Sequence, residues 1–256
     1  MRHLKIVKWF FVPVFFLGII AAAVVNFYNA DYAKNALDFF RARFLGGQSV
    51  EEAVAKYEPR LLSNTKESGF IARCGYPKEV LFFADKSKRI LSVYGRAGGK
   101  EKFEHLKDYP FTGFSGKLGP KLKSGDRQIP EGIYGIEYLN PNSTFHLSLK
   151  VSYPGDFDVK KALADGRKLE ELGGDIMIHG RSGTVGCIPI GDDAVEEVFI
   201  IAAKAGIHNI KVIISPCNLL SCERNFAKDV GVPWYGELIE NIRSEMLKYK
   251  ALGVVF

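Results

Sequence analysis

The sequence predicts a mainly β domain with flanking α-helices, preceded by an N-terminal transmembrane helix. Three patterns lead to this fold class. Short apolar runs bounded by turn residues fill the middle of the chain, apolar residues at three- and four-residue spacing mark both ends of the globular part, and one uncharged apolar stretch lies near the start. The 256 residues contain no internal repeat, so we expect one domain of ordinary size with added elements.

The N-terminal segment, residues 1–30, predicts the compartment. Basic residues precede a run from Trp9 to Val25 that has no charge. This run is at the lower limit of what crosses a hydrocarbon core of about 30 Å. Positive charge before it predicts a cytoplasmic N-terminus and export of the rest. A cleaved signal peptide is the alternative. We expect an uncleaved anchor in the inner (cytoplasmic) membrane, with the catalytic domain facing the periplasm or cell exterior.

Helices are expected on both sides of the β-rich part. Apolar residues recur at helical spacing through residues 31–69, which predicts a helical linker or cap. Within it, Ser49 and Glu52 have the spacing of a capping box at a helix start. Residues 217–256 are expected to form a helical extension whose last helix runs from about residue 236 to 252.

Residues 70–216 are expected to form the β-rich catalytic domain. Two short apolar runs, Val80 to Phe83 and Ile90 to Tyr94, are separated by turn residues and predict a hairpin. The segment from 95 to 131 is rich in Gly, Lys and Pro, so we expect mainly loop with one short strand. A later amphipathic pattern that begins at Ala194 predicts a helix.

The run from Phe145 to Tyr153 alternates between apolar and polar residues. Phe145 falls on the apolar face, whereas His146, Ser148 and Lys150 fall on the polar face. The pattern leaves His146 open to two interpretations. It is predicted either to line a substrate groove or to be a hydrogen-bonded structural histidine.

The net charge of +6 admits several kinds of anionic partner. Lys and Arg are spread along the chain, with no dense run and none of the interleaved aromatic residues that single-strand binders use. We therefore expect no nucleic-acid partner.

One window carries the candidate chemistry. A short apolar strand, Asp175 to Ile178, leads directly to His179, a glycine-rich turn follows, and Cys187 comes just before a helix. An imidazole can take the proton of a neighbouring thiol and so produce a nucleophile. No Asp or Glu lies between the two residues, so a main-chain carbonyl is expected to orient the imidazole. Gly186 would let the backbone approach a substrate closely, and amides around Cys187 are candidates for an oxyanion hole.

Other interpretations of this window compete. A structural Cys beside a buried His is common. A zinc site needs three or four ligands, so Cys217 and Cys222 would have to join His179 and Cys187. A papain-like arrangement places the cysteine before the histidine, and only His208 follows Cys187. We expect neither a metal nor a cofactor.

The remaining cysteines leave the disulfide pairing open. If Cys187 stays a free thiol in an exported protein, at most one pair can form among the other three. Cys217 and Cys222 are close in sequence, while Cys74 could pair with either.

The window resembles the signature of the L,D-transpeptidase (YkuD-type) catalytic domain family, a His-Gly pair followed by Ser/Thr-x-Gly-Cys. The short spacing resembles the family's compact murein L,D-transpeptidase-like subgroup, which also has Pro-Glu-Gly-x-Tyr, Asn-Pro-x-Ser and a His-Leu strand that ends in Tyr-Pro. The matching residues are His179-Gly180, Thr184 to Cys187, Pro130 to Tyr134, Asn140 to Ser143, His146-Leu147 and Tyr153-Pro154.

The resemblance implies a β-sandwich with a substrate groove, in which Cys187 is the nucleophile and His179 the base. It implies that the Gly180 carbonyl orients the imidazole and that amides near Gly186 and Cys187 hold the oxyanion. The family's substrates are peptidoglycan stem peptides, which form a thioester on the cysteine. An amine of another stem or of a wall-linked protein resolves the thioester, or water does so in a cysteine amidase. A catalytically inert wall-binding scaffold is the alternative from another class.

Two positions depart from the family pattern. Val185 stands where most members have His, and Pro189 stands where most have an Arg that could bind a substrate carboxylate. Arg181 or Lys150 would have to replace that arginine.

Two further residues are candidates for substrate contact. Tyr134 would flank a substrate peptide, and its ordinary alternative is packing within a strand. Thr184 would hydrogen-bond near the thiolate, and its ordinary alternative is turn formation. With His146 and Arg181, they complete the set of predicted substrate-binding residues.

Overall fold

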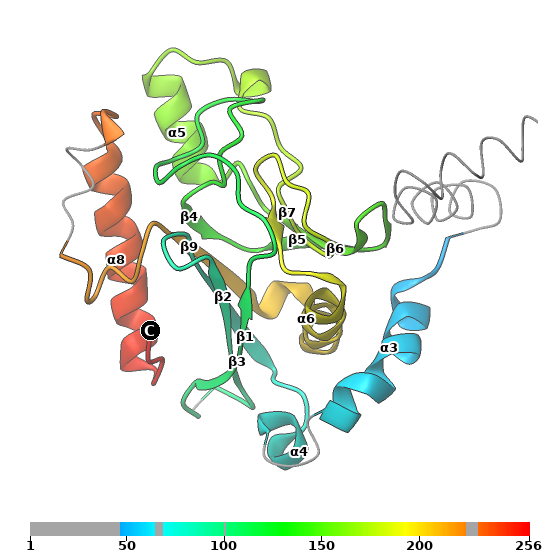
Figure 1. The fold of residues 1–256 in the computed structure, drawn as a ribbon. Helices are drawn as coiled ribbons and strands as arrows, with labels where there is room; N and C mark the ends of the chain where they lie inside the picture. Colours follow the sequence, from blue (N-terminus) through cyan, green and yellow to red (C-terminus); the bar gives the residue numbers. More distant parts are fainter. Residues whose placement is uncertain (1–46, 65–68, 100, 224–229) are drawn as a thin grey trace, which may run out of the picture. The chain divides into compact units, whose positions relative to one another are not determined.

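The computed structural model describes residues 47–64, 69–99, 101–223 and 230–256 (Figure 1). Gln48–Phe256 forms one compact unit, and the other unit, Met1–Gly47, lies almost entirely outside the described residues. The predicted membrane anchor and the first part of the 31–69 segment therefore lie outside them as well. Within the described ranges, no helix has the length and apolar character needed to cross a membrane.

A mixed five-stranded sheet, here sheet A, forms one half of the core in the order β3-β2-β1-β9-β4. The predicted hairpin is confirmed by β1 and β2, which pair antiparallel, and β9 lies parallel to β1 on the other side. The strands are β1 (Glu79–Asp85), β2 (Ile90–Arg96), β3 (Glu104–Pro110), β4 (Gly132–Tyr134) and β9 (Ile210–Ser215).

A four-stranded sheet, here sheet B, forms the other half in the order β5-β6-β7-β8. Its strands are β5 (Ile136–Ser143), β6 (His146–Val151), β7 (Met177–His179) and β8 (Ile188–Pro189). The chain passes from sheet A to sheet B at Gly135, whose amide donates to Ser152 Oγ at 2.8 Å. The consecutive strands β4 and β5 therefore lie in different sheets.

Helix α6 (Asp192–Ala205) packs against both sheets and is buried on almost every side (Figure 1). Its amphipathic pattern predicted a helix with one apolar face, and the additional burial comes from sheets on two sides. Apolar side chains of β1, β6 and α6 meet in one cluster: Val80, Phe82, Ala84, Leu147, Leu149, Val151, Val195, Val198 and Phe199.

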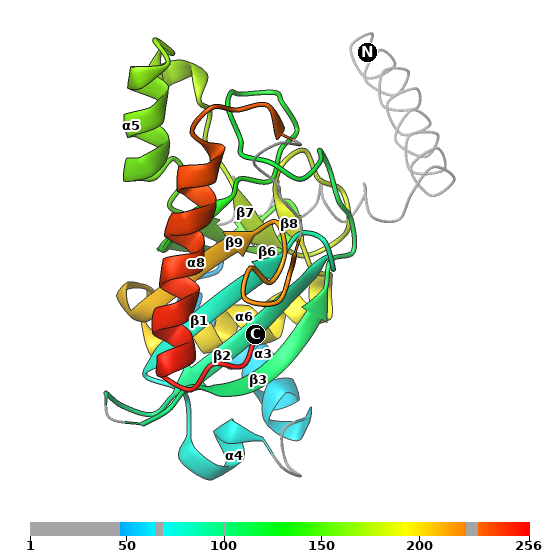
Figure 2. The same cartoon turned by 90° about the vertical axis from the view of Figure 1, so that its left-hand side faces the viewer.

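Further helices cover the sheets. Helix α8 (Tyr235–Ala251) lies across the face of sheet A that points away from α6, as Figure 2 shows. Helix α3 (Val50–Asn64) begins with the predicted capping box, because Glu52 N donates to Ser49 Oγ at 3.1 Å and Ser49 N donates to Glu52 at 2.8 Å. The other helices are α4 (Phe70–Cys74), α5 (Asp156–Ala164), η1 (Leu169–Glu171) and η2 (Ile207–Asn209).

The architecture combines two sheets with helices, which agrees with the predicted mainly β core and its helical flanks. The long loop before β4 is fixed by a buried ion pair. Lys86 Nζ lies 2.7 Å from Glu131 Oε1, and neither side chain has exposed surface. Lys86 also donates to the carbonyls of Gly119 and Ile129, and Tyr235 of α8 donates to the other Glu131 oxygen. Glu131 of the Pro-Glu-Gly-x-Tyr stretch therefore joins this loop to β1 and α8.

Candidate active site

The candidate residues lie on the face of sheet B that points away from the core. Ile178 of β7 pairs with Ile188 of β8, and both are fully buried in the core. Because side chains alternate along a strand, Met177 and His179 point to the opposite face. Cys187 directly precedes β8, and the Met177 amide donates to its Sγ at 3.4 Å. The short parallel pairing of β7 and β8 thus brings His179 and Cys187 to one surface.

The Cys187 side chain is a partly buried thiol that donates to the Asp175 carbonyl at 3.3 Å. Burial raises the pKa of Cys187 above its ordinary value, and the hydrogen bond from Met177 N opposes this only in part. A catalytic cysteine that is activated in the free protein ionises below the ordinary thiol pKa of about 8.5. The structure differs because the thiol is removed from water, so the free protein holds a neutral thiol at neutral pH.

His179 is 2% exposed, and its Nδ1 lies 2.5 Å from the Gly180 carbonyl oxygen. A carbonyl oxygen only accepts hydrogen bonds, so Nδ1 carries the proton and the lone pair of the neutral ring is on Nε2. Burial lowers the pKa of His179, and the Gly180 hydrogen bond opposes this. The contact with Gly180 that the family resemblance implies is present, and it leaves Nε2 able to accept a proton.

Tight backbone contacts fix the turn between the two residues. A Cβ atom at Gly180 would lie 2.5 Å from Asp192 Oδ1 and 2.7 Å from the Phe145 carbonyl oxygen. Asp192 Oδ1 also accepts the Arg181 amide at 2.9 Å. Gly186 has a φ of 115°, and a Cβ there would lie 2.9 Å from the Gln128 carbonyl oxygen. Both positions therefore require glycine.

The two amides expected in the oxyanion hole differ in whether they already donate a hydrogen bond. The Gly186 amide, which the family resemblance assigns to the oxyanion hole, donates to Ser115 Oγ at 2.8 Å and is therefore occupied in this structure. The Cys187 amide has no acceptor among the residues that the structure describes. Thr184 Oγ1 donates to the Cys187 carbonyl at 2.8 Å, which is the turn contact of its ordinary interpretation.

Two lysine side chains that are largely buried lie near the thiol and favour its ionised form. Lys121 is held by Asp126 at 2.7 Å. Lys150, on the same sheet face as Met177, has longer contacts, 3.4 Å to Glu137 and 3.8 Å to Asp175. Lys150 is therefore the less tightly paired cation of the two.

Two predicted substrate contacts lie elsewhere. Tyr134 is 4% exposed, its ring packs against Tyr153, and its hydroxyl donates to the Glu131 carbonyl. None of its described contacts is with His179 or Cys187, so the structure places it in the core. His146 has a φ of 77°, which breaks the strand alternation and turns its ring toward Glu196, with Nε2 2.6 Å from Oε1. His146 therefore makes the hydrogen-bonded contact of its structural interpretation.

Sequence reasoning missed three neighbours of the site. Phe145 was assigned to the apolar face of its strand, yet its ring packs on the His179 imidazole, with centroids 4.6 Å apart. Ser148 pairs with His179 across β6 and β7, and its buried hydroxyl has no partner among the described residues. Ser115 comes from a loop distant in sequence. Only the Ser148 alternation gave a signal that could have found one of them.

The other cysteines do not join the site. All four cysteines are free thiols, and Cys217 is buried next to Cys222 in the cluster under α8. No group of three His, Cys, Asp or Glu side chains suited to a metal occurs within the described ranges. The zinc set considered from the sequence is not assembled there.

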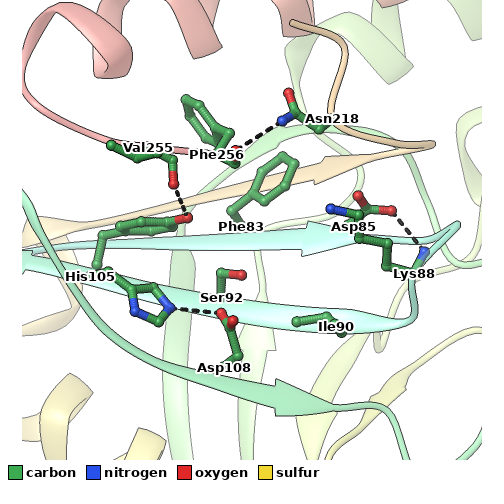
Figure 3. A pocket seen from close by; sticks show the side chains of 11 residues that line it. Phe83, Asp85, Lys88, Ile90, Ser92, His105, Asp108, Asn218, Val255 and Phe256 are labelled. Carbon is green, nitrogen blue, oxygen red and sulfur yellow. Dashed lines mark hydrogen bonds and ion pairs between the residues drawn. The ribbon is translucent and has the colours of Figure 1, made fainter. Parts of the chain in front are cut away.

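A separate cavity of about 350 Å³ lies on the α8 side of sheet A (Figure 3). Phe83 and Phe256 form part of its apolar wall, and His105 contacts Asp108 at its rim. Neither His179 nor Cys187 lines it. The candidate catalytic residues and this cavity therefore lie on different sheets.

The fold and the site define a two-sheet domain that presents a thiol and an oriented, neutral imidazole on one sheet face. No family model matches the chain. Two relatives named "Putative L,D-transpeptidase YafK", from Escherichia coli strains K12 and O157:H7, are each 30% identical over 181 residues. The matched part covers 68% of this chain and 64% of each relative. The chain therefore contains an L,D-transpeptidase-like domain, which confirms the predicted family resemblance.

Two solved structures are distant likenesses of this chain. The helical cell shape determining protein Pgp2 from Campylobacter jejuni is 20% identical with a TM-score of 0.43, over 63% of this chain and 56% of that one. L,D-transpeptidase 1 of Mycobacterium tuberculosis is 13% identical with a TM-score of 0.32, over 54% of this chain and 62% of that one. Likenesses at these TM-scores carry no conclusion about function.

Proposed function

We propose that the chain is a peptidoglycan L,D-transpeptidase-type cysteine acyl transferase, with Cys187 as nucleophile and His179 as base. The observation that carries this proposal is the hydrogen bond from His179 Nδ1 to the Gly180 carbonyl, on the sheet face that holds Cys187. It leaves Nε2 as the proton acceptor, which is what a neutral thiol requires. A structural Cys-His pair has no need of an imidazole fixed in this tautomer.

The reaction proceeds in two acyl transfers. The Cys187 thiol gives its proton to His179 Nε2, and the sulfur attacks the carbonyl of the third residue of a stem peptide. A carbon–sulfur bond forms, the bond to the following D-alanine breaks, and the departing amine takes the proton from His179. An acceptor amine then attacks the thioester, His179 takes its proton, and the thiol is restored. The Cys187 amide stabilises the oxyanion in both steps.

Substrate binding is assigned to cations beside the thiol. Lys150 replaces the arginine that the family has at the position of Pro189, because its loosely paired ammonium group lies on the face of Cys187. Arg181, in the turn before Cys187, is the second candidate for a substrate carboxylate. Replacing Lys150 by Met should raise KM for the stem peptide about tenfold, the effect of one lost charge-assisted contact.

The proposed location follows from the sequence. An N-terminal anchor in the inner membrane would hold the domain in the periplasm, where stem peptides and wall-linked proteins are the acceptors in reach. The aligned part spans 64% of the relatives' length, so the activity and partners of the whole protein rest on this proposal and not on the match.

The test uses the full chain in detergent, purified disaccharide-tetrapeptide and product analysis by mass spectrometry. Cross-linked dimers with loss of D-alanine from the wild type, and none from Cys187→Ala, would support the transferase. Shortened stems without dimers would show that water resolves the thioester, as in a cysteine amidase. Bound but unchanged substrate would leave only the wall-binding scaffold.

A further inference from the structure

A continuous series of contacts connects helix α3 to His179, the candidate general base. The series begins at Arg60, whose guanidinium lies 2.9 Å from Asp193 and 2.8 Å from Glu196, both on α6. The contact with Glu196 is a charge pair, without the angles of a hydrogen bond. The Glu196 side chain is 8% exposed, and burying a carboxylate is costly without partners of opposite charge.

Glu196 holds the next residue of the series. Its other oxygen, Oε1, lies 2.6 Å from His146 Nε2, and the Tyr57 ring of α3 packs edge-on against His146 with centroids 5.4 Å apart. His146 is thus held from two helices. Because His146 has a φ of 77°, these contacts maintain a backbone conformation that a non-glycine residue rarely adopts.

The conformation of His146 places Phe145 against the site. The Phe145 ring packs on the His179 imidazole with centroids 4.6 Å apart, and the ring also approaches Gly183 of the turn. The Phe145 carbonyl lies against Gly180, the residue whose own carbonyl orients His179. One peptide segment therefore contacts both the imidazole and the group that fixes its tautomer.

We propose that Arg60 of α3 is a positioning residue for His179, and that it acts through Glu196, His146 and Phe145. The inference rests on the proposed function for its kinetic consequence, but the positioning itself is a property of the folded protein. The described ion pairs of Arg60 are with Asp193 and Glu196, and neither involves Cys187. Its removal leaves the buried Glu196 carboxylate with His146 alone, so the His146 segment and the Phe145 ring lose part of their support.

The decisive measurement is the NMR spectrum of the full chain in detergent with isotope-labelled histidine, because the Phe145 ring shifts the His179 imidazole signals. His179→Gln assigns those signals. We expect Arg60→Ala and Glu196→Gln to move them toward their positions in Phe145→Ala. Arg60→Lys, which keeps a positive charge, should restore much of the wild-type position.

Arg73→Ala is the matched control. Arg73 is also a helical arginine in an ion pair, 2.7 Å from Glu104, but both partners are well exposed and neither contacts the series. Arg73→Ala should leave the His179 signals unchanged.

Kinetics of stem-peptide turnover give the second arm. Arg60→Ala should lower kcat on the order of tenfold with little change in KM, which is within the range of coupling through a packed network. Combined with Phe145→Ala, it should add little further loss, because both variants interrupt the same series.

The outcomes separate the two proposals. Unchanged His179 signals in Arg60→Ala and Glu196→Gln would overturn the positioning role, and so would shifted signals with an unchanged kcat. If wild-type protein turns over no stem peptide, the proposed function fails. The spectra then still decide whether α3 positions His179.

Discussion

The ring of Phe145 packs on the imidazole of His179 at a centroid distance of 4.6 Å, with the planes tilted by 46°. Alternation along the strand assigned Phe145 to the core. The positive φ of His146 reverses that assignment and makes the ring a cover for the candidate base. Burial lowers the pKa of His179, and the Phe145 ring packs directly on that imidazole.

The pH dependence of turnover should have its acidic midpoint below 6.5, the ordinary histidine value. The base must be neutral, and burial lowers the pKa of His179, so activity is present above that lowered pKa and is lost as pH falls through it. The measurement is kcat/KM of the full chain from about pH 4 to about pH 8, a range that brackets the ordinary histidine pKa of about 6.5. A midpoint at or above the ordinary value would contradict the assignment of His179 as a buried base.

Thiol labelling should distinguish Cys74 from Cys187. Cys74 is exposed, whereas burial raises the pKa of Cys187 and lowers its thiolate content. At neutral pH, iodoacetamide should therefore label Cys74 faster, as followed by peptide mass spectrometry. Cys187 labelling should accelerate only in alkaline solution. Faster labelling of Cys187 at neutral pH would mean that the free protein already holds a thiolate, contrary to the structure.

Gly180→Ala should destabilise the fold by about 1–3 kcal/mol, the usual cost of overpacking. The new methyl group would press on Asp192 and on the Phe145 carbonyl, at 2.5 and 2.7 Å. Denaturant unfolding of the full chain measures the change. Gly98→Ala is the control, because a Cβ at Gly98 meets no atom within 4 Å. Equal stability of the two variants would show that the turn can move without cost.

Glu131→Gln should lower the free energy of unfolding by about 3–5 kcal/mol, because it leaves the buried Lys86 charge without its partner. Burial lowers the pKa of Lys86, and Glu131 opposes this, so the partner is needed to keep the ammonium charged. Glu104→Ala, which breaks the exposed pair with Arg73, should leave stability unchanged in the same denaturation experiment. Similar behaviour of both variants would contradict the structural role of the Lys86–Glu131 pair.

Sequence patterns predicted the structural elements that are determined by residues close together in the sequence. The hairpin of β1 and β2, the capping box of α3 and the strand that ends at His179 follow from turn chemistry and periodicity. The contact between His179 and Gly180 also follows, because the two residues are adjacent in sequence.

Long-range contacts were outside the reach of sequence patterns. Ser115, which lies in a loop without periodicity, accepts a hydrogen bond from the Gly186 amide. The His146 ring contacts Glu196 and so points away from the strand face that alternation predicts for it. The raised pKa of Cys187 likewise depends on burial by segments distant in sequence. Each of these features needs the packing of separate elements, which no local pattern encodes.

The central claim, that Cys187 forms a thioester with a stem peptide, is tested most directly by rapid-quench mass spectrometry of the protein itself. Full-length protein is mixed with disaccharide-tetrapeptide and quenched in acid, and the modified residue is located in peptides. We expect an acyl adduct that has lost D-alanine, on Cys187 alone, in the wild type and in Cys74→Ser but not in His179→Gln. Products without any adduct on Cys187, or an adduct that forms equally well without His179, would contradict the mechanism.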